Sequence, residues 1–444
     1  MQAFSSFYRP LSLVTRLCWA FCAAMLAIAA SAAEAPGSPS PALAADGPAL
    51  SPNTAAEGAQ RILVMLRLPP PRQRLGAAYA GAYGDSAVQA ARSRLARGIA
   101  RRHQLVLVES WAMPALALDC FVMQAAVGAD IAKLIAALVQ EPAVELVQPV
   151  QSFEALGSGQ TISPVGLRPA SASLQPWRVT ELHKVATGKG ASVAIIDSQI
   201  TRRHPDLAGQ LYELRDFTGR PASTGERHGT AVAGVIAART GNAKGVAGIA
   251  PAARVHGLRA CWEDVDPVRN GATICDSFSL AKAMLHAIDA GADVINLSLA
   301  GPGDPLLARI LDVAAHRRIW LVAARHPSLP GGGFPASHRG VVVATDRGAD
   351  AGITSPGLYV APGRDVLTTT PGGWGLVAGS SFAAAHLSGL LALVRSVGQT
   401  GADGGSHLVR AGFATVDSCA TLASASRRCV CSCRYSDRSQ PPSR

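Results

Sequence analysis

The sequence predicts an α/β fold, in which a parallel sheet with helices on both faces follows a small α+β domain of βαββαβ order. Apolar strand-like runs alternate with helical patterns through the larger, C-terminal part of the chain, which is typical of such sheets. The preceding segment has two successive strands between its helices, which indicates a split βαβ sandwich. The composition agrees with a folded chain rich in turns, since 444 residues are 48% hydrophobic, 16% charged and include 44 Gly.

The first 33 residues have the pattern of an export signal. Arg9 and Arg16 precede an uncharged run over 17–33, and Ala30-Ser31-Ala32 offers a small-residue cleavage site. A retained membrane anchor is the alternative, but the run is shorter than the ~20 apolar residues that a span needs. We therefore expect an exported protein, periplasmic or extracellular, with no stable membrane span after signal removal. Residues 34–60, rich in Ala, Pro and Ser, are expected to form a flexible leader.

Residues 61–150 are expected to form the small domain. Strand patterns cover 61–68, 104–110, 115–126 and 143–150, and helical patterns cover 85–102 and 129–140. Nine Arg and a single acidic residue lie between Arg61 and Arg102, within a chain of net charge +11. Such a run suits nucleic acid, but no aromatic interleaving or binding motif accompanies it. We therefore expect a solvated helix face and no nucleic-acid partner.

The larger domain is predicted to span 177–397, after a Gly-, Ser- and Pro-rich linker over 151–176. Its first buried strand run ends at Asp197, and a later one, IWLVAA, ends at Ala324. In open α/β sheets the functional residues gather at the carboxyl ends of the strands. This placement favours an enzyme.

A serine at a helix start supplies a candidate nucleophile. Gly379-Ser380-Ser381 runs directly into an apolar helix, where unpaired N–H groups and the helix dipole favour a developing negative charge. In isolation the pattern is more typical of an ordinary N-cap serine on a buried helix. Asp197 at a strand end and His228 at a helix start supply the carboxylate and imidazole that activate a hydroxyl. The order Asp, His, Ser is one of three unrelated orders in which this geometry recurs.

Three segments resemble the active-site blocks of subtilisin-like serine peptidases: VAIIDSQITRRHPDL (193–207), RHGTAVAGVIAA (227–238) and GSSFAAAHLSG (379–389). The resemblance implies a secreted endopeptidase with Asp197 as orienting acid, His228 as general base and Ser381 as nucleophile. It also implies that Ser298, Leu299, Ala300 and Gly301 hold an extended peptide. The small domain would then be an inhibitor-type propeptide, cut off within the linker. The implied partners are protein or peptide substrates and the chain's own propeptide.

The clearest departure from the family pattern concerns the oxyanion hole. His326 stands where the family has an Asn whose side chain donates to the developing oxyanion, although an imidazole N–H can also donate. The alternative is that His326 is merely a loop residue. Gln199 and Ala385 also replace the usual Gly and Pro, and Ser380 the usual Thr.

Two other functions compete with an active peptidase. An inactive homologue that binds peptides is favoured by the His326 substitution and disfavoured by the intact triad. An α/β-hydrolase esterase is disfavoured because that fold orders its triad Ser, Asp, His and needs Gly after the nucleophile's next residue, whereas Phe382-Ala383 follow Ser381.

The remaining predictions concern cysteines, metals and the C-terminus. Cys261 and Cys275 bracket a polar, turn-rich insertion, and we expect a disulfide between them; Cys120, in an apolar run, is expected to be a buried thiol. Cys429, Cys431 and Cys433 lack the spacing of a zinc site. We expect no cofactor or metal, and calcium is implied only by the family resemblance. Residues 398–444 show no clear element and are expected to be a divergent, poorly ordered tail.

Overall fold

The structure is a computed structural model. It describes residues 60–67, 83–161, 177–222, 226–241, 245–264, 271–346, 357–401, 403–412 and 414–431. The predicted signal, nearly all of the leader, and residues 162–176 of the predicted linker lie outside the described residues.

The small domain has the predicted strand and helix order. Its elements are β1 (Arg61–Arg67), α2 (Tyr83–Arg102), β2 (Val106–Met113), β3 (Leu118–Gln124), α3 (Ile131–Leu138) and β4 (Val144–Pro149). The strands form a sheet in the order β2-β3-β1-β4, in which every pairing is antiparallel. Along β1, Ile62, Val64 and Leu66 pack with the apolar residues of α2 and α3, while Leu63 and Met65 join a core shared with the larger domain. The alternation of the strand therefore gives this sheet two buried faces.

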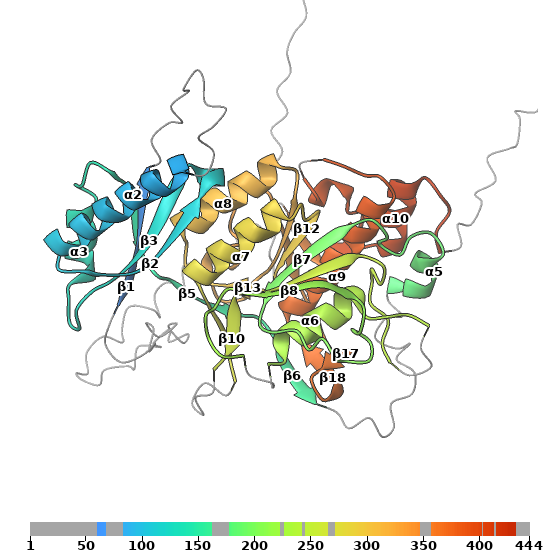
Figure 1. The fold of residues 1–444 in the computed structure, drawn as a ribbon. Coiled ribbons are helices and arrows are strands. Elements are labelled where there is room, and N and C mark those ends of the chain that lie inside the picture. Colours follow the sequence, from blue (N-terminus) through green and yellow to red (C-terminus); the bar gives the residue numbers. More distant parts are fainter. Residues whose placement is uncertain are drawn as a thin grey trace, which may run out of the picture. The chain divides into compact units, whose positions relative to one another are not determined.

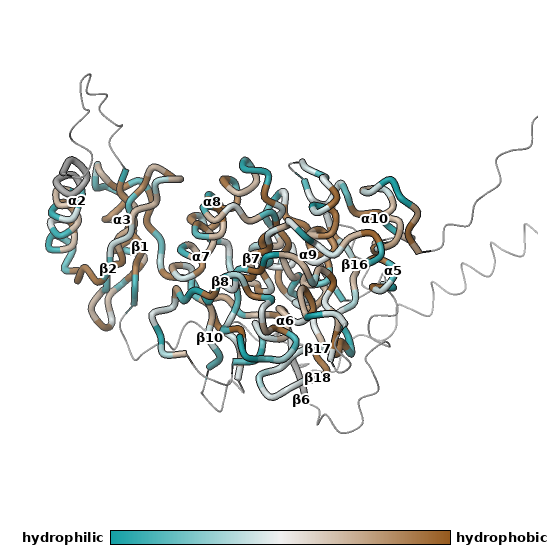
Figure 2. Tube along the Cα trace, turned by 45° about the vertical axis from the view of Figure 1, so that its right-hand side comes forward, coloured by the Kyte–Doolittle hydropathy of each residue, from teal (hydrophilic) through white to brown (hydrophobic). Residues whose placement is uncertain are grey.

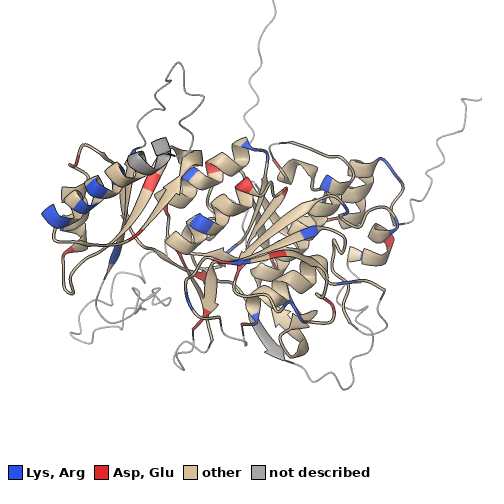
Figure 3. Cartoon of the chain, viewed as in Figure 1, with Lys and Arg blue, Asp and Glu red and all other residues tan. Residues whose placement is uncertain are grey.

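The arginine-rich segment forms the exposed side of α2. Ala96, Ile99 and Ala100 are buried, whereas Arg94, Arg97 and Arg101 are exposed, and Figure 3 shows basic residues spaced along this helix. Arg92 pairs with Asp119. The segment is thus an amphipathic helix with its basic side in solvent.

The larger domain is built on a nine-stranded sheet in the order β19-β20-β16-β15-β14-β12-β7-β9-β8. All its pairings are parallel except the terminal β19–β20 pair. The strands are β7 (Ser192–Asp197), β8 (Leu211–Asp216), β9 (Arg254–Arg259), β12 (Val294–Leu297), β14 (Trp320–Ala324), β15 (Val341–Thr345), β16 (Leu358–Val360), β19 (Arg410–Ala411) and β20 (Thr415–Val416). This is the predicted parallel sheet.

Helices cover both faces of this sheet (Figure 1). On one face lie α6 (His228–Ala237) and α9 (Ser380–Ser396), with α5 (Val179–His183) and α10 (Ser418–Ser426); on the other lie α7 (Ser277–Asp289) and α8 (Pro305–His316). Successive residues of β7 divide between the two cores, with Val193 and Ile195 on one side and Ala194 and Ile196 on the other. Figure 2 shows the apolar residues of α9 and the central strands inside the domain.

The predicted linker is wrong over its first part, because Ser152–Ala155 and Ser158–Thr161 form strands on the larger domain. A four-stranded sheet has the order β10-β11-β5-β13, and a three-stranded sheet the order β17-β18-β6. Their strands are β5 (Ser152–Ala155), β6 (Ser158–Thr161), β10 (Cys261–Glu263), β11 (Thr273–Asp276), β13 (Leu299–Ala300), β17 (Val366–Thr370) and β18 (Gly373–Ala378). A Gly- and Ser-rich composition did not prevent pairing, since main-chain hydrogen bonds need no particular side chain.

The prediction of no ordered element after residue 397 is also wrong for the described part of the tail. Residues up to Cys431 add two strands and α10, whose N-cap Asp417 accepts a hydrogen bond from the Ala420 N–H. A disulfide joins Cys419 to Cys431, so Cys431 has a partner that the sequence analysis did not identify. The structure also joins Cys261 to Cys275, the pairing expected from the sequence. Cys120 is a buried free thiol, and burial raises its pKa to about 12.

Candidate active site

Asp197 and His228 form a buried pair at the carboxyl edge of the sheet. Asp197 is the last residue of β7, and His228 is the first residue of α6. The Nδ1 atom of His228 lies 2.8 Å from the Oδ1 atom of Asp197, and both side chains are buried. Burial lowers the pKa of His228, but the charge and hydrogen bond of Asp197, together with the charge of Glu263, outweigh burial, and the net pKa lies above the ordinary value. The carboxylate thus orients the imidazole and stabilises its protonated form.

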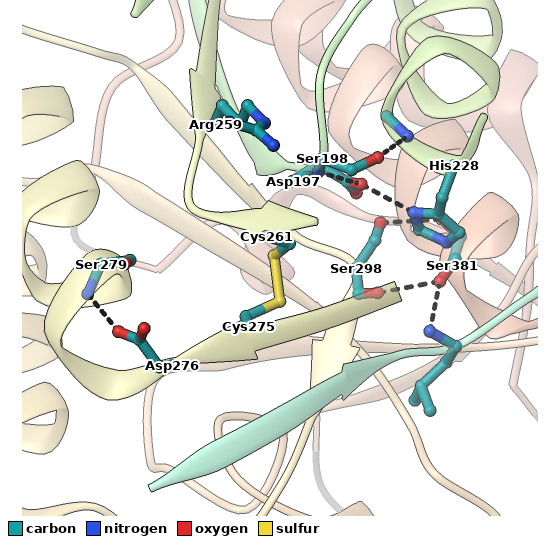
Figure 4. Close-up of a disulfide and its surroundings, with 12 residues drawn as sticks. Asp197, Ser198, His228, Arg259, Cys261, Cys275, Asp276, Ser279, Ser298 and Ser381 are labelled. Atoms are coloured by element: carbon teal, nitrogen blue, oxygen red, sulfur yellow. Dashed lines mark hydrogen bonds and ion pairs between the residues drawn. A yellow bond between two sulfur atoms is a disulfide. The ribbon is translucent and has the colours of Figure 1, made fainter. Parts of the chain in front are cut away.

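Ser381 lies beside this pair in the first turn of α9 (Figure 4). Gly379 precedes the helix with φ of 141°, a conformation that side chains rarely adopt. The hydroxyl of Ser381 donates to the carbonyl oxygen of Ser298 at 2.9 Å. Nε2 of His228 is buried without a hydrogen-bond partner in the described structure. No hydrogen bond joins this nitrogen to the Ser381 Oγ atom in the described structure, and catalytic hydrogen bonds often tighten only in the reacting complex.

A peptide segment of the chain itself occupies the space in front of Ser381. The backbone N–H of Ser381 donates to the carbonyl oxygen of Leu156 at 3.0 Å. The N–H of Leu156 lies 3.1 Å from the Ser381 Oγ and 3.1 Å from the Ser298 carbonyl oxygen. The carbonyl of the Leu156–Gly157 peptide bond therefore lies against the candidate nucleophile with one oxyanion donor in place.

The strands on either side fix this peptide in an extended conformation. β5 lies between β11 and β13 in antiparallel registers, where Phe153 pairs with Cys275 and Ala155 with Leu299. Past Gly157, β6 pairs antiparallel with β18. The predicted peptide-holding residues, Ser298, Leu299, Ala300 and Gly301, thus lie along or beside the bound strand. Chain segments on both sides of one peptide bond are held by main-chain pairing, the geometry by which proteins bind extended peptides.

One side chain of the bound segment is deeply seated. Phe153, three residues before Leu156, is 2% exposed and its ring centroid lies 6.3 Å from that of Phe334. A Cβ atom at Gly301 would lie 2.4 Å from the Phe153 Cδ1 atom, so the absence of a side chain there makes room for the ring. The pocket that holds Phe153 therefore suits a large apolar group.

His326 lies in the loop after β14. Its Nδ1 atom accepts from the N–H of Ser328 at 3.1 Å, which places the neutral ring's proton on Nε2. The hydroxyl of Ser380 donates to the carbonyl oxygen of the neighbouring Arg325 at 2.8 Å. Burial lowers the pKa of His326. The ring has an N–H available, but the donor on Leu156 in the described structure is the Ser381 N–H, so the oxyanion role of His326 stays a prediction.

Carboxylates that the sequence did not predict surround the start of α6. Glu226 accepts a hydrogen bond from the Gln199 N–H at 2.6 Å and pairs with the buried Arg259 at 2.6 Å. Glu263 accepts from the N–H groups of Arg227 and His228. These residues belong to no motif, and their positions relative to His228 depend on the tertiary fold.

Two further observations bear on cofactors and membranes. Within the described ranges, no group of three or more His, Cys, Asp or Glu side chains is arranged to hold a metal ion. No helix of the described residues is both long and apolar enough to cross a bilayer.

The fold agrees with comparisons to known proteins. Residues 188–325 match the subtilase family. The chain is 32% identical over 285 residues to a thermophilic serine proteinase of Bacillus sp. (strain AK1), covering 61% of this chain and 68% of that protein. It is 30% identical over 227 residues to thermitase of Thermoactinomyces vulgaris, covering 49% of this chain and 78% of thermitase. The chain therefore belongs to the subtilase family and is a serine-type endopeptidase.

A solved structure shows a similar fold. Fervidolysin from Fervidobacterium pennivorans, described as a keratinolytic enzyme related to subtilisin, aligns with a TM-score of 0.61 at 20% identity. The alignment covers 83% of this chain and 62% of that chain. At this identity the likeness supports the subtilisin-like fold alone.

Proposed function

We propose that this chain is an exported endopeptidase that hydrolyses peptide bonds through Asp197, His228 and Ser381, and that it first cuts its own Leu156–Gly157 bond. One observation carries the proposal: the Leu156 carbonyl oxygen accepts the Ser381 N–H at 3.0 Å, beside the His228–Asp197 pair. A bond held in this way between two paired strands is positioned as a substrate.

The residues of this site can account for each step of the reaction. His228 takes the hydroxyl proton on Nε2 while Ser381 Oγ attacks the carbonyl carbon of Leu156, and the charge that forms on the oxygen is stabilised by the Ser381 N–H. The C–N bond to Gly157 then breaks, and the imidazolium returns the proton to the leaving amine. The same imidazole then takes a proton from water, which attacks the acyl ester. As the ester C–O bond breaks, the imidazolium returns that proton to the Ser381 Oγ atom. Asp197 stabilises the imidazolium in both halves of the reaction.

The contacts of the small domain support a role as a propeptide. Gln148 reaches the start of α8, where its side chain donates to Asp304 at 2.8 Å and accepts from the Leu306 N–H at 3.0 Å. At the start of α7, the Ser277 hydroxyl oxygen accepts from the Gln151 N–H at 2.9 Å. The Ser277 N–H also donates to the Gln151 carbonyl oxygen at 3.0 Å. Gln148 near the end of β4 and Gln151 just after it thus satisfy N–H groups of two helix N-termini, next to the residues that enter the cleft.

Mass spectrometry of the secreted full-length chain tests both parts of the proposal. We expect a mature product that begins at Gly157, while Ser381→Ala should stay uncut and fail to react with a fluorophosphonate probe. An uncut Ser381→Ala chain that is cleaved by added wild-type enzyme at the same bond would confirm the position of the site. If the Ser381→Ala chain yields a product that begins at Gly157 without added wild-type enzyme, another protease carries out the processing.

A further inference from the structure

The start of helix α6 is stabilised from outside its own segment. Arg227, at the N-cap position, makes no side-chain capping bond, although the first N–H groups of a helix need acceptors. The Glu263 Oε1 atom accepts from the His228 N–H at 3.0 Å and also from the Arg227 N–H. The next N–H, of Gly229, donates to the Ser198 Oγ at 3.0 Å. The helix that begins with the candidate base is therefore capped by the two strand ends beside it.

Glu263 reaches this position on a hairpin that also binds the peptide. β10 pairs antiparallel with β11, with Glu263 opposite Thr273 and Cys261 opposite Cys275, where the disulfide joins the two strands. The other edge of β11 pairs with the bound segment β5. A single cross-linked hairpin thus contacts the backbone of His228 with one strand and the peptide with the other.

Glu263 is one of the charged groups that act on the His228 imidazole. Asp197 faces the imidazole from β7, and α9 places the Phe382 ring against it, with a centroid distance of 5.7 Å. Glu226 also lies close, but Arg259 pairs with it, at 2.6 Å. The Glu263 carboxylate adds to Asp197 in raising the pKa of His228. Burial raises the pKa of Glu263 itself, against its two N–H donors.

We propose that Glu263 is a positioning residue for the catalytic histidine: its carboxylate fixes the first turn of α6 and supports the imidazolium that forms when Ser381 attacks. The proposal rests on the peptidase function above. Because Glu263 contacts neither the peptide nor Ser381 in the described structure, its loss should lower kcat and leave KM nearly unchanged. The electrostatic stabilisation that a carboxylate provides at a partly buried helix N-terminus corresponds to a factor of about 3 to 30 in rate. We expect the loss of Glu263 to lower kcat by this factor.

The test compares Glu263→Gln and Glu263→Ala with a control, Glu181→Gln, which removes a carboxylate on the distant helix α5. Gln keeps a hydrogen-bond acceptor but removes the charge, so we expect a smaller fall in kcat than with Ala. For Glu263→Gln, the acidic limb of the pH profile of kcat/KM should move to lower pH, since the pKa of His228 falls when the nearby negative charge is removed. Active-site titration with a fluorophosphonate normalises each rate to correctly folded enzyme.

The outcomes are distinguishable from failure of the peptidase proposal. If Ser381→Ala remains active, the proposed function itself fails, whatever Glu263 does. If Glu263→Gln keeps both wild-type kcat and the wild-type acidic limb, or if only KM changes, the positioning role is wrong. If Glu263→Ala does not fold, the pH profile of Glu263→Gln tests the positioning role. Loss of a helix cap that is merely structural would not shift the acidic limb.

Discussion

We expect the peptidase to prefer substrates with Phe three residues before the leucine at the cleaved bond. Replacing Gly301 by Ala should abolish this preference. A Cβ atom there would lie 2.4 Å and 2.9 Å from the Cδ1 and Cε1 atoms of Phe153, well inside contact distance. The backbone of Gly301 exchanges two hydrogen bonds with Phe334 and has no positive φ, so alanine fits the main chain. The change therefore acts on the pocket.

The magnitude follows from the burial that the pocket provides. Phe153 is 2% exposed, and fully burying a Phe side chain is worth about 1.5–3 kcal/mol. If that energy is realised in the transition state, it corresponds to a roughly 10- to 150-fold preference in kcat/KM. Gly301→Ala should remove most of this preference.

The assay uses two peptides with the same leaving group, Phe-Glu-Ala-Leu and Ala-Glu-Ala-Leu, and the processed enzyme. Wild type should favour the first peptide by the factor above, and Gly301→Ala should cleave both at similar rates. Gly303→Ala is the matched control, because a Cβ at Gly303 meets no atom within 4 Å. If Gly301→Ala slows both peptides equally or retains the preference for Phe, the pocket beside Gly301 does not set this preference.

Three other predictions follow from features away from this pocket. Changing Cys261 and Cys275 together to Ala should lower the unfolding free energy by about 3 kcal/mol, since the bridge closes a loop of sequence separation 14, and denaturant unfolding should measure this loss; an unchanged midpoint would contradict it. Hydrogen bonds from Arg102 and His103 lower the pKa of Glu141 to about 2. Its contribution to stability should therefore be present above the unfolded pKa of about 4.3 and lost as the pH falls toward 2, and Glu141→Gln should flatten acid unfolding over this interval. If His326 donates to the oxyanion, His326→Ala should lower kcat with little change in KM, whereas equal rates would make it a loop residue.

The residues of the candidate site were predictable because each lies in a local pattern. Asp197 ends a buried strand run, and His228 and Ser381 begin small-residue helices, so their chemistry and order could be recognised from short segments. Parallel β-α alternation also predicted the sheet that brings the strand ends together. Each of these features is determined by residues that are close together in the sequence, so it can be recognised without the tertiary structure.

The occupant of the cleft was not predictable in the same way. Ser158-Gly159-Gln160-Thr161 has no apolar alternation and forms a strand because the edge of β18 offers unpaired main-chain groups. The role of Glu263 was not predictable either, because the β10–β11 hairpin, and not spacing in the sequence, brings it close to His228. The tail was missed because α10 has a single large apolar residue, the buried Leu422, among Ser, Ala, Thr and Cys. The Asp417 cap and the Cys419–Cys431 bridge add to the stability of this helix.

The pairing of β6 with β18 affects what happens after the first cut. Hydrolysis at Leu156–Gly157 would divide the bound segment, and the half that begins at Gly157 would stay covalently part of the mature enzyme. Its residues 158–161 would still occupy the groove that must accept the leaving half of the next substrate. The new N-terminus would therefore compete as an intramolecular ligand, at an effective concentration that no dilution lowers. A newly cut molecule would gain full activity only as this strand detaches, so self-cleavage and activation would be separate kinetic events.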